Sequence, residues 1–196
     1  MSTNEQFSKL LLASFPPEPM PARFFWKEGT HNADDEFCRD LIQWLAKRQW
    51  TEIKMSDWAM IGNIRIVRER LEPATFLYYL PSLLLGVTQE PGYLDWALEG
   101  LMPSGRDRRP KSKWWGELLE TISSDQIGAL LAFLAHVRNS LLLPDKEPSV
   151  VSTAEALTAE AETFWDAQVL LSTSRRSGEY GATSALGTFE TYRNLR

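Results

Sequence analysis

Few residues of this chain have the types and spacing that metal binding or catalysis requires. His31 precedes Asp34 and Asp35 by three and four residues, so the three side chains offer one nitrogen and two carboxylates to an ion such as Zn²⁺. A turn followed by the start of a helix seldom directs three such groups at one point. The pattern therefore favours a capped helix N-terminus over a metal site.

Two other residues have catalytic side chains. His136 could act as a general base, but its place between Ala135 and Val137 in an apolar helical stretch favours a hydrogen-bonded histidine at the edge of the core. Cys38 lies near the start of a predicted helix, where the dipole lowers a thiol pKa, but its neighbours are acidic and its spacing predicts burial. Serine-hydrolase, zinc-protease, phosphate-loop and dinucleotide motifs do not occur in the sequence. We expect a protein without enzymatic activity, metal or cofactor.

An alternative site lies at Tyr78 and Tyr79, next to Pro81 in the most apolar run of the chain. A proline inside a helix cannot donate to the carbonyl four residues back, so the helix must bend or break there. A carbonyl freed in this way could meet a ligand, although the apolar surroundings favour core tyrosines with hydroxyls that reach the surface. The alternative function is a small-molecule-binding helical protein or enzyme with a pocket at Pro81.

Acidic residues predominate on the surface that the pattern predicts. A formal net charge of −5 and a pI of about 5.2 make nucleic acid an improbable partner, because nonspecific affinity for it depends on Lys and Arg. Carboxylates instead speed the encounter with a basic protein. The candidate partner-binding residues are Asp34, Asp35, Glu36, Asp40, Glu155, Glu160, Glu162 and Asp166.

The basic residues gather in one predicted loop between positions 104 and 113. Such a loop could contact phosphate or an acidic partner, but exposed charged loops also serve solubility alone, which we favour here. The loop contains Arg106, Arg108, Arg109, Lys111 and Lys113, opposed by Asp107.

Apolar spacing along the chain is mostly helical, which predicts an all-α fold: an irregular multi-helix bundle with a proline-kinked central helix and a C-terminal helical extension. The predicted helices include residues 33–49, 56–71, 73–87, 93–102 and 114–122. Residues 16–31, which are rich in proline and aromatic residues, predict an extended segment that crosses the core.

Two capping boxes mark the last predicted helices. The first involves Ser124 and Gln126, and the second Ser152 and Glu155. The second box predicts a helix over about 152–171, whose buried stripe ends at Val169 and which is followed by a loosely held tail. We therefore divide the chain into a helical domain, 1–143, and a C-terminal part, 144–196, packed on it.

The chain has the composition of a cytoplasmic protein. One cysteine excludes an internal disulfide framework, and the first twenty residues lack the layout of a secretory signal. The longest apolar run, Phe76 to Leu85, is about ten residues long, whereas a membrane span needs about 20.

The segment around residues 71–81 resembles a phrase of an uncharacterised bacterial helical domain family, Leu-x-Pro-x-x-Phe-x-Tyr-Tyr-Leu-Pro. The family also has a tryptophan-rich helix before this phrase and a Ser-x-x-Gln-x-x-x-Leu-x-x-Phe-Leu helix after it. The resemblance spans about residues 5–143 and implies a compact helical protein, without implying an activity. The matching residues are Trp44, Trp50, Leu71, Pro73, Phe76, Tyr78, Tyr79, Leu80, Pro81, Ser123, Gln126, Leu130, Phe133 and Leu134.

These observations predict a non-enzymatic interaction protein. The lack of catalytic motifs, the acidic helix faces and the lineage-specific look of the family favour an immunity protein, which neutralises a secreted bacterial toxin by covering its active site. Any of the eight tryptophans left exposed beside carboxylates would be an anchor for such a partner.

Overall fold

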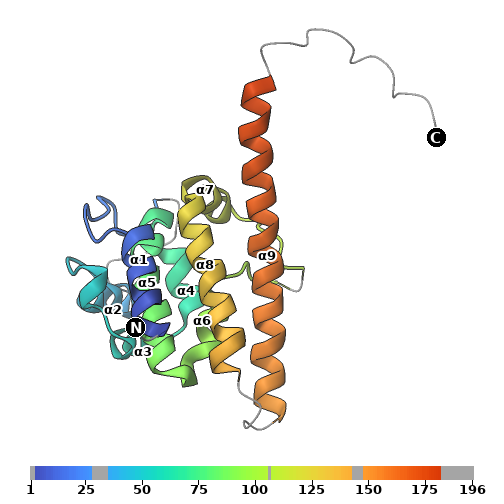
Figure 1. Ribbon diagram of the computed structural model, residues 1–196. Coiled ribbons are helices and arrows are strands. Elements are labelled where there is room, and N and C mark those ends of the chain that lie inside the picture. Colours follow the sequence, from blue (N-terminus) through green and yellow to red (C-terminus); the bar gives the residue numbers. More distant parts are fainter. Residues whose placement is uncertain (1–2, 28–34, 106, 143–147, 182–196) are drawn as a thin grey trace.

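The computed structural model describes residues 3–27, 35–105, 107–142 and 148–181, and this part of the chain confirms the all-α prediction (Figure 1). Its only β pairing is a single bridge between Phe25 and Leu71. Two 3₁₀ turns, Trp50–Glu52 and Pro91–Tyr93, and a π-helical segment, Val137–Leu141, complete the regular structure. The α-helices are α1 Thr3–Ser14, α2 Glu36–Trp44, α3 Met55–Ile61, α4 Ile64–Arg70, α5 Pro73–Gln89, α6 Leu94–Gly100, α7 Lys113–Thr121, α8 Ser124–His136 and α9 Pro148–Gly181.

Helix α5 is the centre of the core, as its apolar sequence predicts. Thirteen of its 17 residues are buried, and Pro73 occupies the first turn, where a missing N–H costs nothing. The helix continues through Pro81 without a break. Next to this proline, the Ser82 hydroxyl donates to the carbonyl of Tyr79 (2.6 Å) and accepts from the indole of Trp58 (2.9 Å). A buried side-chain network thus surrounds the point at which the helical ladder lacks a donor.

The predicted extended segment is confirmed as far as residue 27, and residues 28–34 lie outside the described part. The Trp26 side chain is buried, and the backbone N–H of Trp26 donates to the carbonyl of Arg70 (2.8 Å). The N–H of Glu72 donates back to the carbonyl of Phe24 (3.0 Å). Residues 15–27 therefore form a strap across the N-terminal end of α5.

Two predicted helices have different bounds in the structure. The helix expected over 33–49 extends only over Glu36–Trp44, and Lys47 has a positive φ of 63°, which helical backbone does not allow. The helix expected over 56–71 is two helices, α3 and α4. They are separated at Gly62, where φ is 89°, a conformation that glycine adopts without strain.

Helix α9 is longer than predicted and begins earlier. It starts at Pro148, so Ser152 lies inside the helix and the predicted capping box is not its start. It ends at Gly181 and so includes part of the segment predicted as a loose tail, whose remainder, 182–196, lies outside the described residues. In α8 the capping serine is Ser123 rather than Ser124, and Gln126 completes the box.

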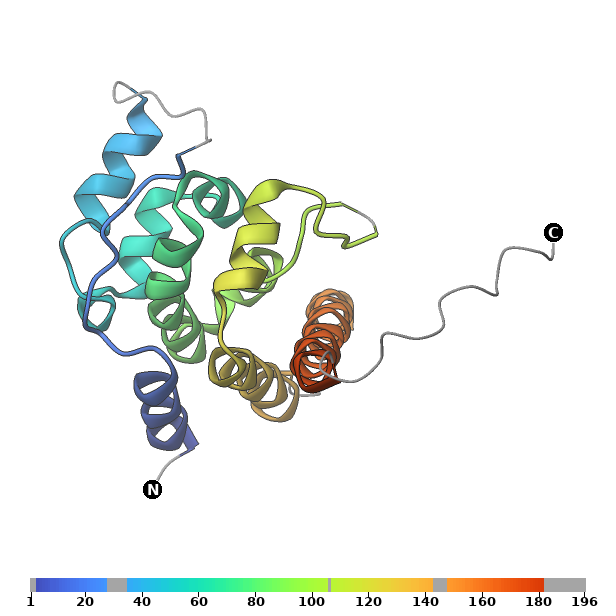
Figure 2. The ribbon, with the colours of Figure 1, turned by 90° about the horizontal axis from the view of Figure 1, so that it is seen from above.

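Helix α9 packs antiparallel on α8 and also covers α6 (Figures 1 and 2). Its contact face contains Ala154, Leu157, Ala161, Phe164 and Trp165, all buried. The indole of Trp165 donates to the carbonyl of Leu101 (3.1 Å) just after α6. The helix is therefore fixed to the body by its first half.

A buried arginine, which the sequence pattern does not reveal, joins α4 to the end of α6. The Arg68 side chain is fully buried, and its guanidinium donates to the carbonyls of Gly100 (3.1 Å) and Met102 (2.6 Å). These carbonyls belong to the C-terminal end of α6, which lacks intrahelical donors and favours a positive charge. Burial lowers the pKa of Arg68, and Glu69 acts in the opposite direction.

Candidate protein-binding surfaces

The two groups of predicted partner-binding carboxylates lie on opposite sides of the molecule. Glu36 and Asp40 belong to α2, whereas the second group belongs to α9, and the body lies between these two helices in both views (Figures 1 and 2). Asp34 is outside the described residues. The structure therefore does not bring the two acidic groups together into one surface.

Asp35 stabilises the start of α2 instead of lying free on the surface. Its carboxylate accepts from the backbone N–H of Phe37 (3.0 Å) and from the guanidinium of Arg70. The hydrogen bond from Phe37 has the largest effect and lowers the pKa of Asp35. Burial opposes it to a smaller extent, and the hydrogen bond and charge of Arg70 lower the pKa further. This confirms the expected capped N-terminus.

On α9, two of the four predicted carboxylates form internal ion pairs. Glu160 accepts from Arg108 (2.8 Å), and Glu162 pairs with Arg138. Glu155 and Asp166 are exposed and form no ion pair with any described residue. Among the α9 side chains that the structure describes, these two carboxylates are therefore the ones exposed to solvent without an ion pair.

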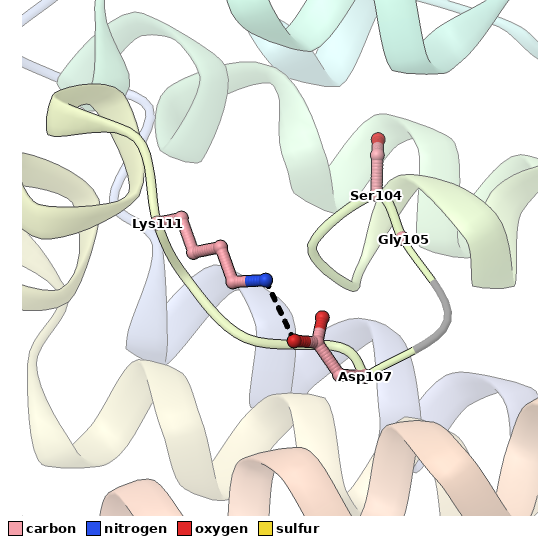
Figure 3. A pocket seen from close by; sticks show the side chains of 4 residues that line it. All are labelled: Ser104, Gly105, Asp107 and Lys111. Carbon is pink, nitrogen blue, oxygen red and sulfur yellow. Dashed lines mark hydrogen bonds and ion pairs between the residues drawn. The ribbon is translucent and has the colours of Figure 1, made fainter.

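The basic loop is largely neutralised by the protein's own carboxylates. Arg108, which has a positive φ of 46°, turns inward and also contacts Glu99 (3.4 Å). Burial opposes this charge, but the hydrogen bonds that Arg108 donates to Glu99 and Glu160 raise the pKa of Arg108 overall. Lys111 donates to Asp107 (2.7 Å), and these two side chains line an open hollow of about 610 Å³ together with Ser104 and Gly105 (Figure 3).

The hydrogen bond from Lys111 lowers the pKa of Asp107, and Arg109 also lies 3.8 Å from the same carboxylate. Arg106 is outside the described residues, and Lys113 begins α7. The described cations of this loop are thus mostly engaged within it or with α9. A phosphate would have to compete with these ion pairs.

Of the two tyrosines proposed to line a pocket at Pro81, only Tyr78 lines a groove described here. Tyr79 is buried, and its hydroxyl donates to the carbonyl of Leu45 (2.7 Å), while burial strongly raises its pKa. Tyr78 donates to the carbonyl of Pro17 (2.9 Å) and lines a groove one helical turn before Pro81. Neither Tyr79 nor Pro81 lines that groove.

The remaining candidate catalytic residues have structural contacts. Cys38 is buried, and Arg70 donates to its sulfur (3.2 Å). The imidazole of His136 stacks on the ring of Phe7, with 5.9 Å between ring centres. His31 lies outside the described residues, and the described part contains no group of three His, Cys, Asp or Glu residues that could hold a metal.

Most of the tryptophans belong to the core. Six of the eight are buried, and Trp44 and Trp96 are half-buried and pack against the core. No tryptophan of the described residues is fully exposed, so their main contribution is to the stability of the body.

The sequence pattern missed an exposed apolar segment on α9, formed by Val169, Leu170 and Leu171. Their exposed fractions are 37%, 70% and 54%. Val169 was expected in the buried stripe, but its side chain is exposed. The signal that could have located this segment is helix length, because no proline interrupts the sequence from 149 to 181.

No single helix in the described ranges is apolar over enough length to cross a membrane; by length and composition alone, only one pair bent by 102°, Lys113–Thr121 with Ser124–Leu141, would qualify. No family model, curated protein or solved structure matches the chain.

Proposed function

We propose that this chain is a non-enzymatic protein-binding protein, and that it is an immunity protein that neutralises a bacterial toxin by covering its active site. The observation that carries the proposal is the projecting end of α9, with Val169, Leu170 and Leu171 exposed next to Asp166. We call these four residues the α9 end surface. Its partner is a protein with an apolar patch bordered by basic residues.

Helix lengths explain why α9 projects. Helix α8 has 13 residues and the π-helical segment that continues it has 5, whereas α9 has 34. Helix α9 is therefore much longer than the element on which it packs, and it extends past the N-terminal end of α8. Figure 1 shows the C-terminal end of α9 rising above the body.

A projecting helix of this composition gains from a partner. After Leu171 the sequence continues Ser-Thr-Ser-Arg-Arg-Ser-Gly, in which serine, threonine and glycine are weak helix formers. Isolated helices of about 12–15 residues are marginal in water, and most helical stability in proteins comes from packing on one face. A surface that packs against this part of α9 would therefore stabilise it.

The side chains suit a protein partner. Fully burying a valine or leucine contributes about 1.5–3 kcal/mol, so the three apolar residues can supply much of an interface core. The unpaired carboxylates of Asp166 and Glu155 favour a basic partner by attracting it over a distance, more than by adding affinity. Toxins that act on nucleic acid present such basic surfaces, because their substrate is polyanionic.

The test is co-expression with the product of a neighbouring gene that encodes a secreted toxin. We expect growth rescue and co-elution of the two products in size-exclusion chromatography. Independent elution without rescue removes the immunity proposal. The chain alone is expected to elute as a monomer by light scattering, and a dimer that Leu170→Glu dissociates would assign the α9 end surface to a second copy of this chain instead.

A further inference from the structure

A preformed groove lies between the strap, α5 and the corner that joins α7 to α8, and no described residue of α9 lines it. Its volume is about 220 Å³, less than the 300–1,000 Å³ of sites for drug-sized ligands. At roughly 30 Å³ per water it has room for about seven waters, or for one small organic group. The groove is lined by Phe15, Pro16, Glu18, Pro19, Pro21, Ala74, Leu77, Tyr78, Thr121 and Gln126.

The wall formed by the strap is held in place from several directions. The indole of Trp50 donates to the carbonyl of Phe15 (2.9 Å), Tyr78 donates to the carbonyl of Pro17 (2.9 Å), and Thr75 donates to that of Arg23. Four prolines between residues 16 and 21 further restrict the backbone of the strap. A ligand would therefore enter a rigid groove without having to order it, which favours affinity.

The charge around the groove is negative. Glu18 is the one charged residue among the described lining residues, and one of its carboxylate oxygens accepts from the side-chain amide of Gln49 (2.6 Å). Burial raises the pKa of the Tyr78 hydroxyl, a backbone hydrogen bond from Trp50 opposes this, and the charges of Glu18 and Glu52 raise it further. Both carboxylates therefore act on the groove.

The rest of the lining is apolar or aromatic. Phe15, Leu77 and Tyr78 form an almost fully buried floor, with exposed fractions of 2%, 3% and 7%. Gln126 accepts from the N–H of Ser123 through its carbonyl oxygen, which leaves its amide NH₂ without a partner in the described structure. Aromatic faces beside a carboxylate attract organic cations, through the ring quadrupole and through charge.

We propose that this groove binds an organic cation, an ammonium or guanidinium group on a short apolar stem. The stem packs on Phe15, Leu77 and Tyr78, and the cation pairs with Glu18. Two sources carry this chemistry, a free small amine and a Lys or Arg side chain of a protein. The inference does not rest on the α9 end surface, and loss of partner binding there would leave it unchanged.

Nuclear magnetic resonance titration of the full chain tests the proposal. The probes are n-butylammonium and 2-phenylethylammonium for the free amines, and N-acetyl-arginine amide and N-acetyl-lysine amide for the side chains. We expect saturable shifts of the amides of Ala74 and Leu77 and of the Gln126 side chain. Saturation by the capped amino acids as well as the amines indicates a protein side chain, and saturation by the amines alone indicates a metabolite.

Two variants separate charge from shape. Glu18→Gln keeps the acceptor for Gln49 and should weaken each cationic probe by about two- to fivefold, as for an exposed ion pair, while leaving n-butanol unaffected. Ala74→Leu fills the groove from an exposed position with a good helix former and should abolish the shifts. Glu36→Gln removes a carboxylate from an exposed position that does not line the groove, and it is the matched control for Glu18→Gln that should retain binding.

Absence of saturable shifts with all four cations overturns the proposal. Equal binding of n-butanol and n-butylammonium also overturns it, because the site would then recognise only the apolar stem. Circular dichroism of each variant shows whether the fold is intact.

Discussion

The guanidinium of Arg68 lies 4.9 Å from the ring centre of Trp115, deep in the protein. At the edge of the same guanidinium, N–H groups donate to the carbonyls of Gly100 and Met102, so the charge of the fully buried side chain is held within the protein. The arrangement combines a cation–π contact with a helix cap. Each carbonyl that Arg68 serves would be left without a donor if the side chain were removed.

We predict that Arg68→Ala lowers the free energy of unfolding by at least about 3 kcal/mol, because several buried acceptors lose their donor. Arg68→Met retains much of the side-chain volume, so the loss of unfolding free energy in this variant reports mainly the contribution of the Arg68 hydrogen bonds. Urea denaturation measures both. Arg65→Ala is the control, since this exposed neighbour on α4 forms only a 3.7 Å ion pair with Glu99 and should change stability by about 0.5 kcal/mol or less. Equal effects of the Arg68 and Arg65 variants would contradict the assignment.

Close packing of α6 against α4 gives a second prediction. A Cβ on Gly100 would lie 2.8 Å from Cγ1 of Ile64, which is fully buried. Gly100→Ala should therefore destabilise the protein by about 1–3 kcal/mol. Gly128→Ala should instead stabilise it by about 0.5–1 kcal/mol, because Gly128 is inside α8 and a Cβ there meets nothing within 4 Å.

A double mutant tests whether that clash is the cause. Ile64→Ala removes the obstructing atom, so Gly100→Ala should cost less in the Ile64→Ala background than in the wild type, by thermal or urea unfolding. Strictly additive effects of the two substitutions would point to a different cause.

The third prediction concerns the α9 end surface. Leu170→Glu and Leu171→Glu should abolish co-elution with the partner while changing the free energy of unfolding by only about 0.5 kcal/mol, because both side chains are already exposed. Met60→Glu is the matched control, a 60% exposed apolar residue on α3 at the opposite side of the body (Figure 1). Partner binding that survives both leucine variants would exclude this surface.

The fourth prediction concerns pH. The folded pKa of Asp35 is lowered from its ordinary 3.8, chiefly by the backbone hydrogen bond of Phe37 and also by Arg70. Its contribution to stability is therefore fully present above pH 3.8 and is lost as pH falls through the folded pKa. Asp35→Asn keeps a capping side chain but not the charge. The difference in unfolding free energy between the wild type and Asp35→Asn should be constant from about pH 5 to 7, where the Asp35 carboxylate is ionised in both the folded and the unfolded protein. It should shrink below pH 3.8.

A fifth prediction tests the network beside Pro81. Ser82→Ala removes the acceptor of the buried Trp58 indole, so it should cost about 1–3 kcal/mol in urea unfolding. Thr88→Ala breaks a similar hydroxyl-to-carbonyl bond one and a half turns along α5, where the side chain is half-buried, and should cost less.

Periodicity predicted the fold class and the central position of α5, because burial imposes the 3.6-residue pattern on sequence wherever one helix face meets the core. The density of proline and aromatic residues predicted the extended strap. It did not locate the gap between α3 and α4, because Met60, Ile64 and Val67 keep helical spacing across Gly62. In the structure Met60 is exposed and the other two are buried. Spacing alone does not show that a backbone turns.

The candidate sites were less predictable for a related reason. The sequence shows which residues carry charge, but it does not show which of them form ion pairs. Arg108 and Glu160, for example, form an ion pair although they are 52 positions apart. Arg68 has the sequence environment of a surface residue, flanked by Val67 and Glu69, and only tertiary packing reveals its burial. The exposure of Leu170 and Leu171 on α9 depends on which neighbouring elements reach them, and sequence spacing does not show this.

The one-sided attachment of α9 has a mechanical consequence. Force applied near Gly181 acts on the body through a lever arm of about 24 Å, the rise of roughly 16 helical residues, with Trp165 close to the fulcrum. A sideways pull at the tip would therefore load the indole bond of Trp165 to Leu101 before the ion pairs of Glu162 and Glu160, which lie farther from the tip. A partner bound at the tip can therefore separate α9 from α6 with a smaller force than a partner bound nearer to Trp165.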